Sequence, residues 1–197
     1  MKKMFALILA LAMIASLFTG CASKADDGVT KVAIVQQLDH SSLDEIRTAI
    51  EAELTSAGIE FKVFNGQNDA SMLNQIGAQV VSDNYDAIIP IATLAAQCMV
   101  TAADGKDIPI IYAACSDPEA AGLTGMNHVT GTSDALNTRF IIDMMLAVNP
   151  DISCVGLLYS NSEINSETPI AEAKAYLTEL GIEYPTNSSS LMPSPSP

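Results

Sequence analysis

Residues 32–45 read VAIVQQLDHSSLDE, and within this short run the pattern changes from that of a β-strand to that of an α-helix. Residues 32–35 are apolar at successive positions, as expected of a strand covered on both faces. Ser42 followed by Glu45 has the spacing of a capping box at a helix start. Apolar residues then recur on one helical face until Gly58 ends the helix: Ile46, Ala49, Ile50 and Leu54. The run therefore predicts one complete strand–helix unit.

The same alternation continues along the chain. Further strands are predicted at residues 61–64, 86–91 and 108–112, with helices between them that begin after Asp69 and at Leu94. The strand starts follow one another at intervals of roughly 22 to 29 residues, which suits right-handed crossovers in a parallel sheet. This pattern predicts an α/β fold with a parallel sheet flanked by helices.

After the fourth strand the rhythm changes. Residues 113–132 are predicted to form a long irregular loop, and long loops in compact domains tend to be functional. A helix is predicted from Ser133 or Asp134 to residue 149, then a strand at 154–159 and a helix from Thr168 to Gly181. The inward face of the first of these helices is predicted from its apolar residues: Leu136, Phe140, Ile141, Met144, Met145 and Val148. We predict a nearly complete N-terminal α/β lobe at residues 31–132 and part of a second α/β lobe at 133–184.

The two ends of the chain differ from this body. Residues 1–20 have the charged start and apolar run of a secretory signal, and small residues precede Cys21. We expect lipid attachment at Cys21 and a flexible tether over residues 21–30. The alternative is an ordinary secretory signal that leaves Cys21 as a free thiol. Residues 185–197, rich in Pro and Ser, predict a disordered tail, which is either natural or the result of a shortened or frame-shifted chain.

Composition limits the partners. The 197 residues include 9 Lys plus Arg against 23 Asp plus Glu, a net charge of -14, so a nucleic acid backbone would be repelled. Three cysteines follow Cys21 without the spacing of a zinc site or a disulfide framework, and we expect all three to be buried thiols: Cys98, Cys115 and Cys154.

Polar residues follow the predicted strands, at the edge where open parallel sheets bind ligands. Candidates are Gln37 after the first strand, Thr93 after the third, Ser116 and Asp117 after the fourth, and Asn161 and Glu163 after the strand at 154–159. Helix capping alone is the alternative explanation, because Ser, Thr, Asn and Asp favour helix starts without any ligand.

Motifs of known chemistry are absent from the sequence. It contains no G-x-G-x-x-G after the first strand, no G-x-x-x-x-G-K-[ST] and no G-x-S-x-G. These are the motifs of dinucleotide binding, nucleotide binding and the hydrolase nucleophile, so the sequence does not support any of these three functions. Only two histidines exist, without Cys or His partners at ligand spacing. We expect no catalytic residue, no metal and no cofactor.

Several ordered motifs together carry a resemblance: DHSSLDEIR (39–47), IATLAAQ (91–97), DIPIIYAACSDP (107–118), VTGTSD (129–134) and VGLLYSNSE (155–163). The sequence resembles the ABC transporter substrate-binding lipoproteins of the tryptophan/tyrosine-binding type, which share the periplasmic-binding-protein type I fold. The resemblance covers about residues 31–183, roughly the first three-fifths of such a protein.

The resemblance implies a non-catalytic, extracytoplasmic receptor, lipid-anchored to the bacterial cell membrane, that presents a small molecule to an ABC permease. For an α-amino acid, Thr93 and Ser116 would donate to the carboxylate and Asp117 would face the ammonium group. Gln37 and the loop with Asn161 and Glu163 would approach from either side of the cleft. Membrane contact would be through the lipid anchor alone, and the preference for an aromatic side chain stays open.

The family's second lobe continues beyond the last predicted element of this chain, so we expect weak or no binding by the chain as written. Three alternatives remain: a sugar, purine or peptide-like ligand in the same fold, an exported flavodoxin-like or Rossmann-like enzyme, and a lipid-anchored surface interaction module without a small ligand.

Overall fold

A five-stranded parallel sheet forms the centre of the protein, in a computed structural model that describes residues 30–161 and 163–185. Its strands are β1 (Lys31–Gln36), β2 (Glu60–Asn65), β3 (Ala87–Ile91), β4 (Ile110–Tyr112) and β5 (Val129–Gly131). Their order is β2-β1-β3-β4-β5, and every pairing is parallel. The prediction of an α/β fold with a parallel sheet is therefore confirmed.

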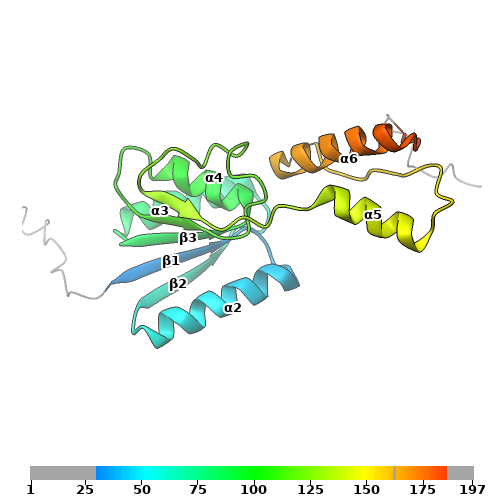
Figure 1. Cartoon of the computed structure of the whole chain (residues 1–197). Helices are drawn as coiled ribbons and strands as arrows, with labels where there is room; N and C mark the ends of the chain where they lie inside the picture. Colours follow the sequence, from blue (N-terminus) through cyan, green and yellow to red (C-terminus); the bar gives the residue numbers. More distant parts are fainter. Residues whose placement is uncertain (1–29, 162, 186–197) are drawn as a thin grey trace, which may run out of the picture.

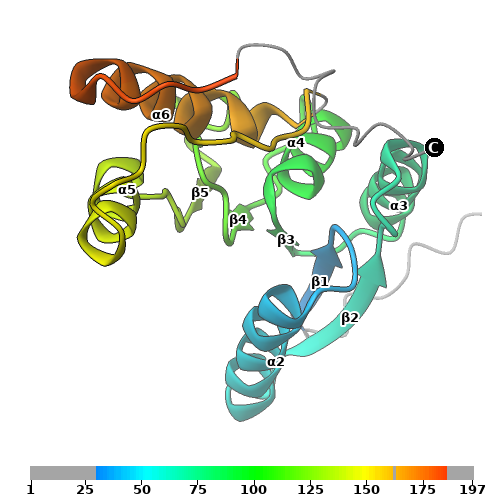
Figure 2. The ribbon, with the colours of Figure 1, turned by 90° about the vertical axis from the view of Figure 1, so that its right-hand side faces the viewer.

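Helices cover both faces of this sheet (Figures 1 and 2). α2 (Ser41–Ser56) lies on one side, and α3 (Ala70–Ser82) and α4 (Thr93–Ala102) lie together on the other. The main core lies between the sheet and the α3–α4 pair, where Val35, Ile88 and Ile110 of the strands are fully buried against helical side chains. The continuous apolar runs of the sequence are thus explained by burial on both faces.

The strand β5 corrects the prediction of an irregular loop over residues 113–132. It has only three residues and pairs with β4 alone among the described residues, so it carries too little hydrophobic pattern to be recognised. Gly131 permits this pairing, because a Cβ atom there would overlap the carbonyl oxygen and ring of Tyr112.

Helix starts agree in part with the sequence. Asp69 caps α3, as predicted, by accepting the Met72 N–H at 2.8 Å. The capping box predicted at the start of α2 is wrong, because His40 is the N-cap and its Nδ1 accepts the Ser42 N–H at 3.3 Å. The helix begins one residue before Ser42, so that serine already lies in its first turn.

A second body follows the sheet. α5 (Thr138–Val148) packs against α6 (Glu167–Leu180), which is preceded by the short 3-10 helix η1 (Ile164–Ser166) (Figure 1). Residues 30–132 are called the sheet unit below, 138–185 the helical unit, and 133–137 the linker. Ile142, Ala173 and Leu177 form the buried centre of the helical unit.

The predicted strand at 154–159 is wrong. Only Cys154 makes a bridge, to Glu183, and the chain beyond it is irregular. Val155 N–H donates to the Glu183 carbonyl at 2.8 Å, and Glu183 N–H donates to the Ser153 carbonyl at 3.0 Å. A strand requires neighbours over several residues, and within the described part of the chain only this point of contact is present.

The predicted inward face of α5 also needs correction. Met145 is partly buried in the helical unit, but the other five predicted residues are exposed: Leu136, Phe140, Ile141, Met144 and Val148. Ile142 occupies the buried position instead. Of the cysteines, Cys98 and Cys115 are buried as expected, whereas Cys154 is exposed.

Three predicted parts of the chain lie outside the described residues: the signal at 1–20, the tether with Cys21 except residue 30, and the tail except residue 185. Among the helices that are described, none has the length and apolar character needed to cross a membrane.

Candidate ligand-binding site

A crevice of about 310 Å³ lies at the carboxyl ends of the central strands. Its lining includes Gln37 and His40 after β1, Ala92 and Thr93 after β3, Ala114 and Ser116 after β4, Asp134 of the linker and Asn165 of η1. Three of the six predicted ligand residues, Gln37, Thr93 and Ser116, therefore line one crevice. This is the edge at which parallel sheets bind ligands.

Two alanines in this lining have strained backbones. Ala92 has φ 76° and Ala114 has φ 53°, values that side chains with a Cβ rarely adopt. Such strain costs on the order of 1–3 kcal/mol and concentrates at functional sites. Ala92 directly follows β3 and Ala114 lies two residues after β4, so the chain turns sharply at each strand end and brings Thr93 and Ser116 to the crevice.

The first turn of α4 faces this crevice without a conventional cap. Ala92 occupies the N-cap position and provides no side-chain hydrogen bond. Gln37 compensates in part, because its Oε1 accepts the Leu94 N–H at 3.0 Å. A helix N-terminus carries partial positive charge and amide donors, both of which favour an anionic group.

Gln37 itself is a connector. Its Nε2 donates to Asn68 Oδ1 at 2.8 Å, and the side chain is nearly buried. Both ends of its amide are therefore occupied by protein atoms, and Gln37 ties the loops after β1 and β2 to α4.

Thr93 is buried at the back of the crevice, 3 % exposed. Its Oγ1 lies 3.5 Å from Cys115 Sγ. Burial raises the pKa of the Cys115 thiol, although the hydrogen bond with Thr93 opposes this shift. Cys115 is thus a packed neutral group that supports Thr93.

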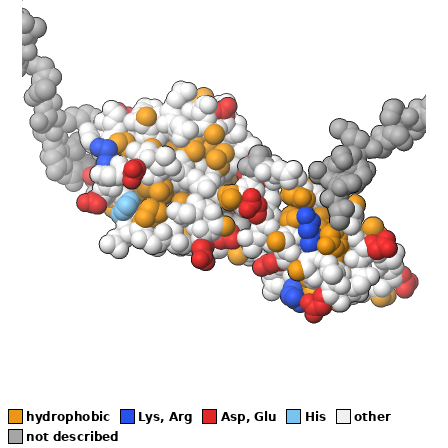
Figure 3. All heavy atoms as spheres, turned by 90° about the horizontal axis from the view of Figure 1, so that it is seen from above, with side chains coloured by type: hydrophobic (Ala, Val, Ile, Leu, Met, Phe, Trp, Pro, Cys, Tyr) orange, Lys and Arg blue, Asp and Glu red, His pale blue; other side chains and the backbone are white. Residues whose placement is uncertain are grey.

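On the opposite wall, Ser116 Oγ donates to Asp134 Oδ1 at 2.9 Å, and Ser133 Oγ donates to the Ser116 carbonyl at 3.1 Å. Asp134 is the one acidic residue that lines the crevice among the described residues, and none of the described lining residues is Lys or Arg. Acidic side chains are also spread over both units on the face shown in Figure 3. The crevice therefore favours a ligand that carries a cationic group.

Asp117 does not line this crevice. Its Oδ1 accepts the Ala120 N–H at 2.9 Å and its Oδ2 accepts the Thr168 hydroxyl at 2.7 Å. These hydrogen bonds lower the pKa of the Asp117 carboxyl. The residue lines a neighbouring hollow of about 420 Å³, which it shares with Ser116 and Thr168. The sequence predicted that Asp117 lies with Gln37 and Thr93 at one site. In the structure Asp117 lies outside the crevice that those two residues line.

The loop with Asn161 and Glu163 also falls outside the crevice. Asn161 is exposed and Glu163 is the N-cap residue of η1. Asn165, two residues farther along, lines the crevice instead, and its buried Oδ1 has no hydrogen-bond partner among the described residues. A buried acceptor without a partner is costly, so a donor on a bound ligand would stabilise this site.

Asp134 and Asn165 were missed by sequence reasoning. The signal available for Asp134 was the Ser133–Asp134 pair, which reads equally well as a helix start. Asn165 lies in the same polar run as Asn161 and Glu163, but only the one-turn helix η1 determines which of them reaches the crevice.

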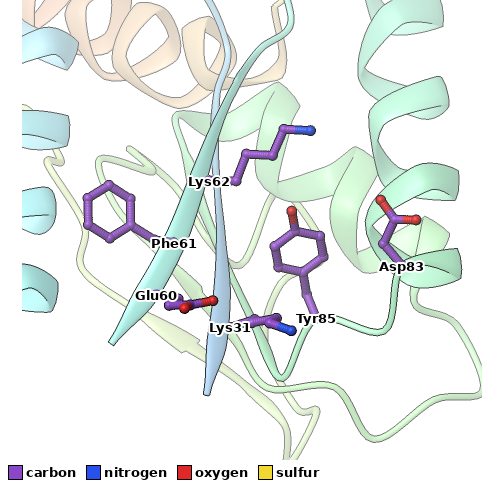
Figure 4. Close-up of a pocket in the computed structure, with 6 residues that line it drawn as sticks. All are labelled: Lys31, Glu60, Phe61, Lys62, Asp83 and Tyr85. Carbon is purple, nitrogen blue, oxygen red and sulfur yellow. The ribbon is translucent and has the colours of Figure 1, made fainter. Parts of the chain in front are cut away.

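Another hollow, of about 320 Å³, lies at the opposite end of the sheet (Figure 4). Lys62 and Tyr85 point to one side of β2 and Phe61 to the other, so these side chains do not converge. Lys31 and Lys62 are accompanied there by Glu60 and Asp83, which offset their charge. The turn between Asp83 and Tyr85 also has a positive φ, 53° at Asn84, but asparagine adopts this conformation more readily than alanine.

Metal binding has no support within the described residues, where no group of three or more His, Cys, Asp or Glu side chains is placed to hold an ion.

Comparison with known proteins agrees with this architecture. A family model described as ABC transporter substrate binding protein matches residues 31–189. The chain is 31% identical over 198 residues to a tyrosine-binding protein of Clostridioides difficile (strain R20291), a match that covers 89% of this chain and 57% of the relative.

Solved structures are similar over comparable lengths. An ABC domain from Streptococcus pneumoniae in complex with L-Trp has a TM-score of 0.74 and 32% identity, over 80% of this chain and 56% of that chain. A ligand-free, open structure of a substrate-binding protein with adhesive properties from Clostridium difficile has a TM-score of 0.63 and 32% identity, over the same shares. The chain thus spans little more than half the length of these relatives.

Proposed function

Since this chain belongs to the ABC transporter substrate-binding protein family, we propose that it captures an amino acid in the crevice and presents it to an ABC permease for import. Relatives named for tyrosine binding and solved with L-Trp support this class of ligand. The proposed role is binding without catalysis, with no cofactor. Because the chain spans about half of its relatives, transport by the whole protein is part of the proposal.

The main support for this proposal is the arrangement of charged and polar groups in the crevice. An α-amino acid has an ammonium and a carboxylate group attached to the same carbon, and the crevice offers a matching pair of environments. Asp134 and the unpartnered oxygen of Asn165 suit the ammonium group. The first turn of α4, whose N-cap residue Ala92 provides no side-chain hydrogen bond, suits the carboxylate together with the Thr93 hydroxyl.

The proposed roles differ from those expected from the sequence. Thr93 and Ser116 remain as contacts for the ligand, with Ser116 acting also to orient Asp134. Gln37 holds the loops that form the wall. Asn161 and Glu163 belong to the segment that leads into Asn165, and we propose no direct ligand contact for them or for Asp117.

We also propose that the sheet unit and the helical unit are the N-terminal lobe and part of the second lobe, divided near residue 132. Secretion by the segment 1–20 and lipid attachment at Cys21 would hold these lobes outside the cell membrane. Radiolabelled palmitate incorporation into the chain, and its loss in Cys21→Ser, would test the anchor.

Equilibrium dialysis with a panel of amino acids tests the ligand class. The absolute affinity of this chain is expected to be weak, but an amino acid such as tyrosine or tryptophan should still bind at least about tenfold more tightly than its N-acetyl derivative or its amide, because each lacks one of the two charges that the crevice matches. Dicarboxylic acids should bind least, since no Lys or Arg is among the described residues that line the crevice. Equal binding of tyrosine and N-acetyltyrosine would contradict the proposal.

A further inference from the structure

The amino-terminal end of α6 is joined to the loop after β4. Thr168 Oγ1 in the first turn of α6 donates to Asp117 Oδ2 at 2.7 Å (Figure 1 shows this end of α6 facing the sheet unit). The other oxygen of the same carboxylate accepts the Ala120 N–H at 2.9 Å, which fixes its orientation within the loop. The hydrogen bond therefore links the helical unit to the sheet unit through one oriented carboxylate.

Both partners lie next to the walls of the crevice. Asp117 immediately follows Ser116, and Thr168 lies three residues after Asn165 in the continuous segment from η1 into α6. Ser116 and Asn165 belong to different units and line the same crevice. A change in the distance between Asp117 and Thr168 would therefore be transmitted directly to the width of the crevice.

We propose that the Asp117–Thr168 hydrogen bond is a clasp, and that Asp117 is a positioning residue that holds Asn165 close to Ser116 and so sets how long a ligand stays enclosed. The inference rests on the proposed function for the identity of the ligand, but the hydrogen bond between the two units does not require a ligand.

The hydrogen bonds of the linker differ in their role from the Asp117–Thr168 clasp. Ser133 and Asp134 of the linker bond to Ser116, so these hydrogen bonds hold the linker to the sheet unit. The pKa of the Asp117 carboxyl is lowered by the Ala120 N–H and then by the Thr168 hydroxyl, which keeps Asp117 ionised as an acceptor. Hydrogen bonds with an ionised partner are stronger than neutral ones.

A distance measurement tests the clasp without any ligand. Spin labels are attached at the exposed Cys154 and at Ser56→Cys on α2, in the chain with Cys21→Ser, because Cys98 and Cys115 are buried. Three variants are compared: Thr168→Val, which removes the hydroxyl, Thr168→Ser, which keeps it, and Thr178→Val as the matched control. Thr178 lies in the same helix and donates to the Lys174 carbonyl of that helix.

We expect Thr168→Val to broaden the distance distribution between the labels, and Thr168→Ser and Thr178→Val to leave it as in the parent chain. Circular dichroism confirms that each variant is folded. A distribution for Thr168→Val that matches the parent would overturn the clasp.

Ligand dissociation provides the second measurement. With the amino acid that binds best in the panel, Thr168→Val should raise the dissociation rate about tenfold and change the association rate little, and Thr168→Ser should restore the parent rate. Unchanged dissociation in Thr168→Val overturns the positioning role. If no variant binds an amino acid but the label distances respond as expected, the proposed function fails and the clasp stands.

Discussion

Gln37 accepts the Leu94 N–H through its Oε1 atom at 3.0 Å, and thereby joins the end of β1 to the first turn of α4. The two residues are far apart in sequence, and the bond lies beside the strained turn at Ala92. Because the other end of the Gln37 amide donates to Asn68, one side chain joins the loops after β1 and β2 to α4.

Replacement of Gln37 by Leu should destabilise the protein and loosen the crevice. The Leu94 N–H would lose its acceptor and Asn68 its donor, and an unsatisfied buried group costs about 1–3 kcal/mol. We expect a fall of this size in the free energy of unfolding, measured by urea denaturation. Gln75→Leu on the exposed surface of α3 is the control and should change stability by less than about 0.5 kcal/mol. Equal stability of the two variants would contradict this role.

The pairing of β5 with β4 depends on the absence of a side chain at Gly131. A Cβ there would overlap the backbone and ring of Tyr112, and backbone has little room to yield. Gly131→Ala should therefore lower the free energy of unfolding by about 1–3 kcal/mol. Gly156→Ala is the matched control, since no atom lies within 4 Å of a Cβ at that position. A stable Gly131→Ala protein with intact β5 amide protection would refute this account.

The parallel sheet could be predicted because β1 and β3 are apolar at successive positions and are separated by amphipathic helices, a pattern that few other folds produce. β5 could not, since it has only three residues, and the need for a glycine at position 131 follows from the position of Tyr112 in the folded sheet. The error at residues 154–159 has the opposite origin. Their apolar pattern favours a strand, but pairing needs neighbours that only tertiary structure supplies.

The candidate site was predictable where a residue lies within a few positions of the end of a strand, as Thr93 does after β3 and Ser116 after β4. Parallel topology then brings such residues to one edge regardless of their separation. Asp117 shows the limit of this rule, because one residue beyond Ser116 its carboxylate is bound by Ala120 and Thr168. Asn165 could not be chosen from its neighbours without the path of η1.

Asp134 should contribute more to ligand affinity than to stability. Among the described residues its carboxylate accepts a hydrogen bond only from the half-buried Ser116 hydroxyl, so Asp134→Asn should fold normally. Loss of the charge facing an ammonium group should weaken amino acid binding about tenfold to a hundredfold. Isothermal titration calorimetry measures the change, with Asp104→Asn, an exposed residue after α4, as control. Retention of full affinity would remove Asp134 from the site.

The three described cysteines should differ in reactivity. Cys154 is exposed, whereas burial raises the pKa of the Cys98 and Cys115 thiols, so less of each is thiolate at neutral pH. In the Cys21→Ser chain at pH 7, we expect one thiol to react quickly with a colorimetric disulfide reagent and two more only after unfolding. Rapid reaction of Cys115 would show that the back of the crevice opens readily.

The helix α5 offers a direct test of which face is buried. Ile142 is 6% exposed and Phe140 is 57% exposed, although the sequence pattern assigns Phe140 to the core. Ile142→Ala should therefore lower the free energy of unfolding by about 2–5 kcal/mol, the range for a buried aliphatic truncation. Phe140→Ala removes a larger side chain but should cost less than about 1 kcal/mol, since most of that ring already contacts water. Urea denaturation of both variants decides between the two faces, because a larger loss for Phe140→Ala would require the exposed side of α5 to be covered in solution.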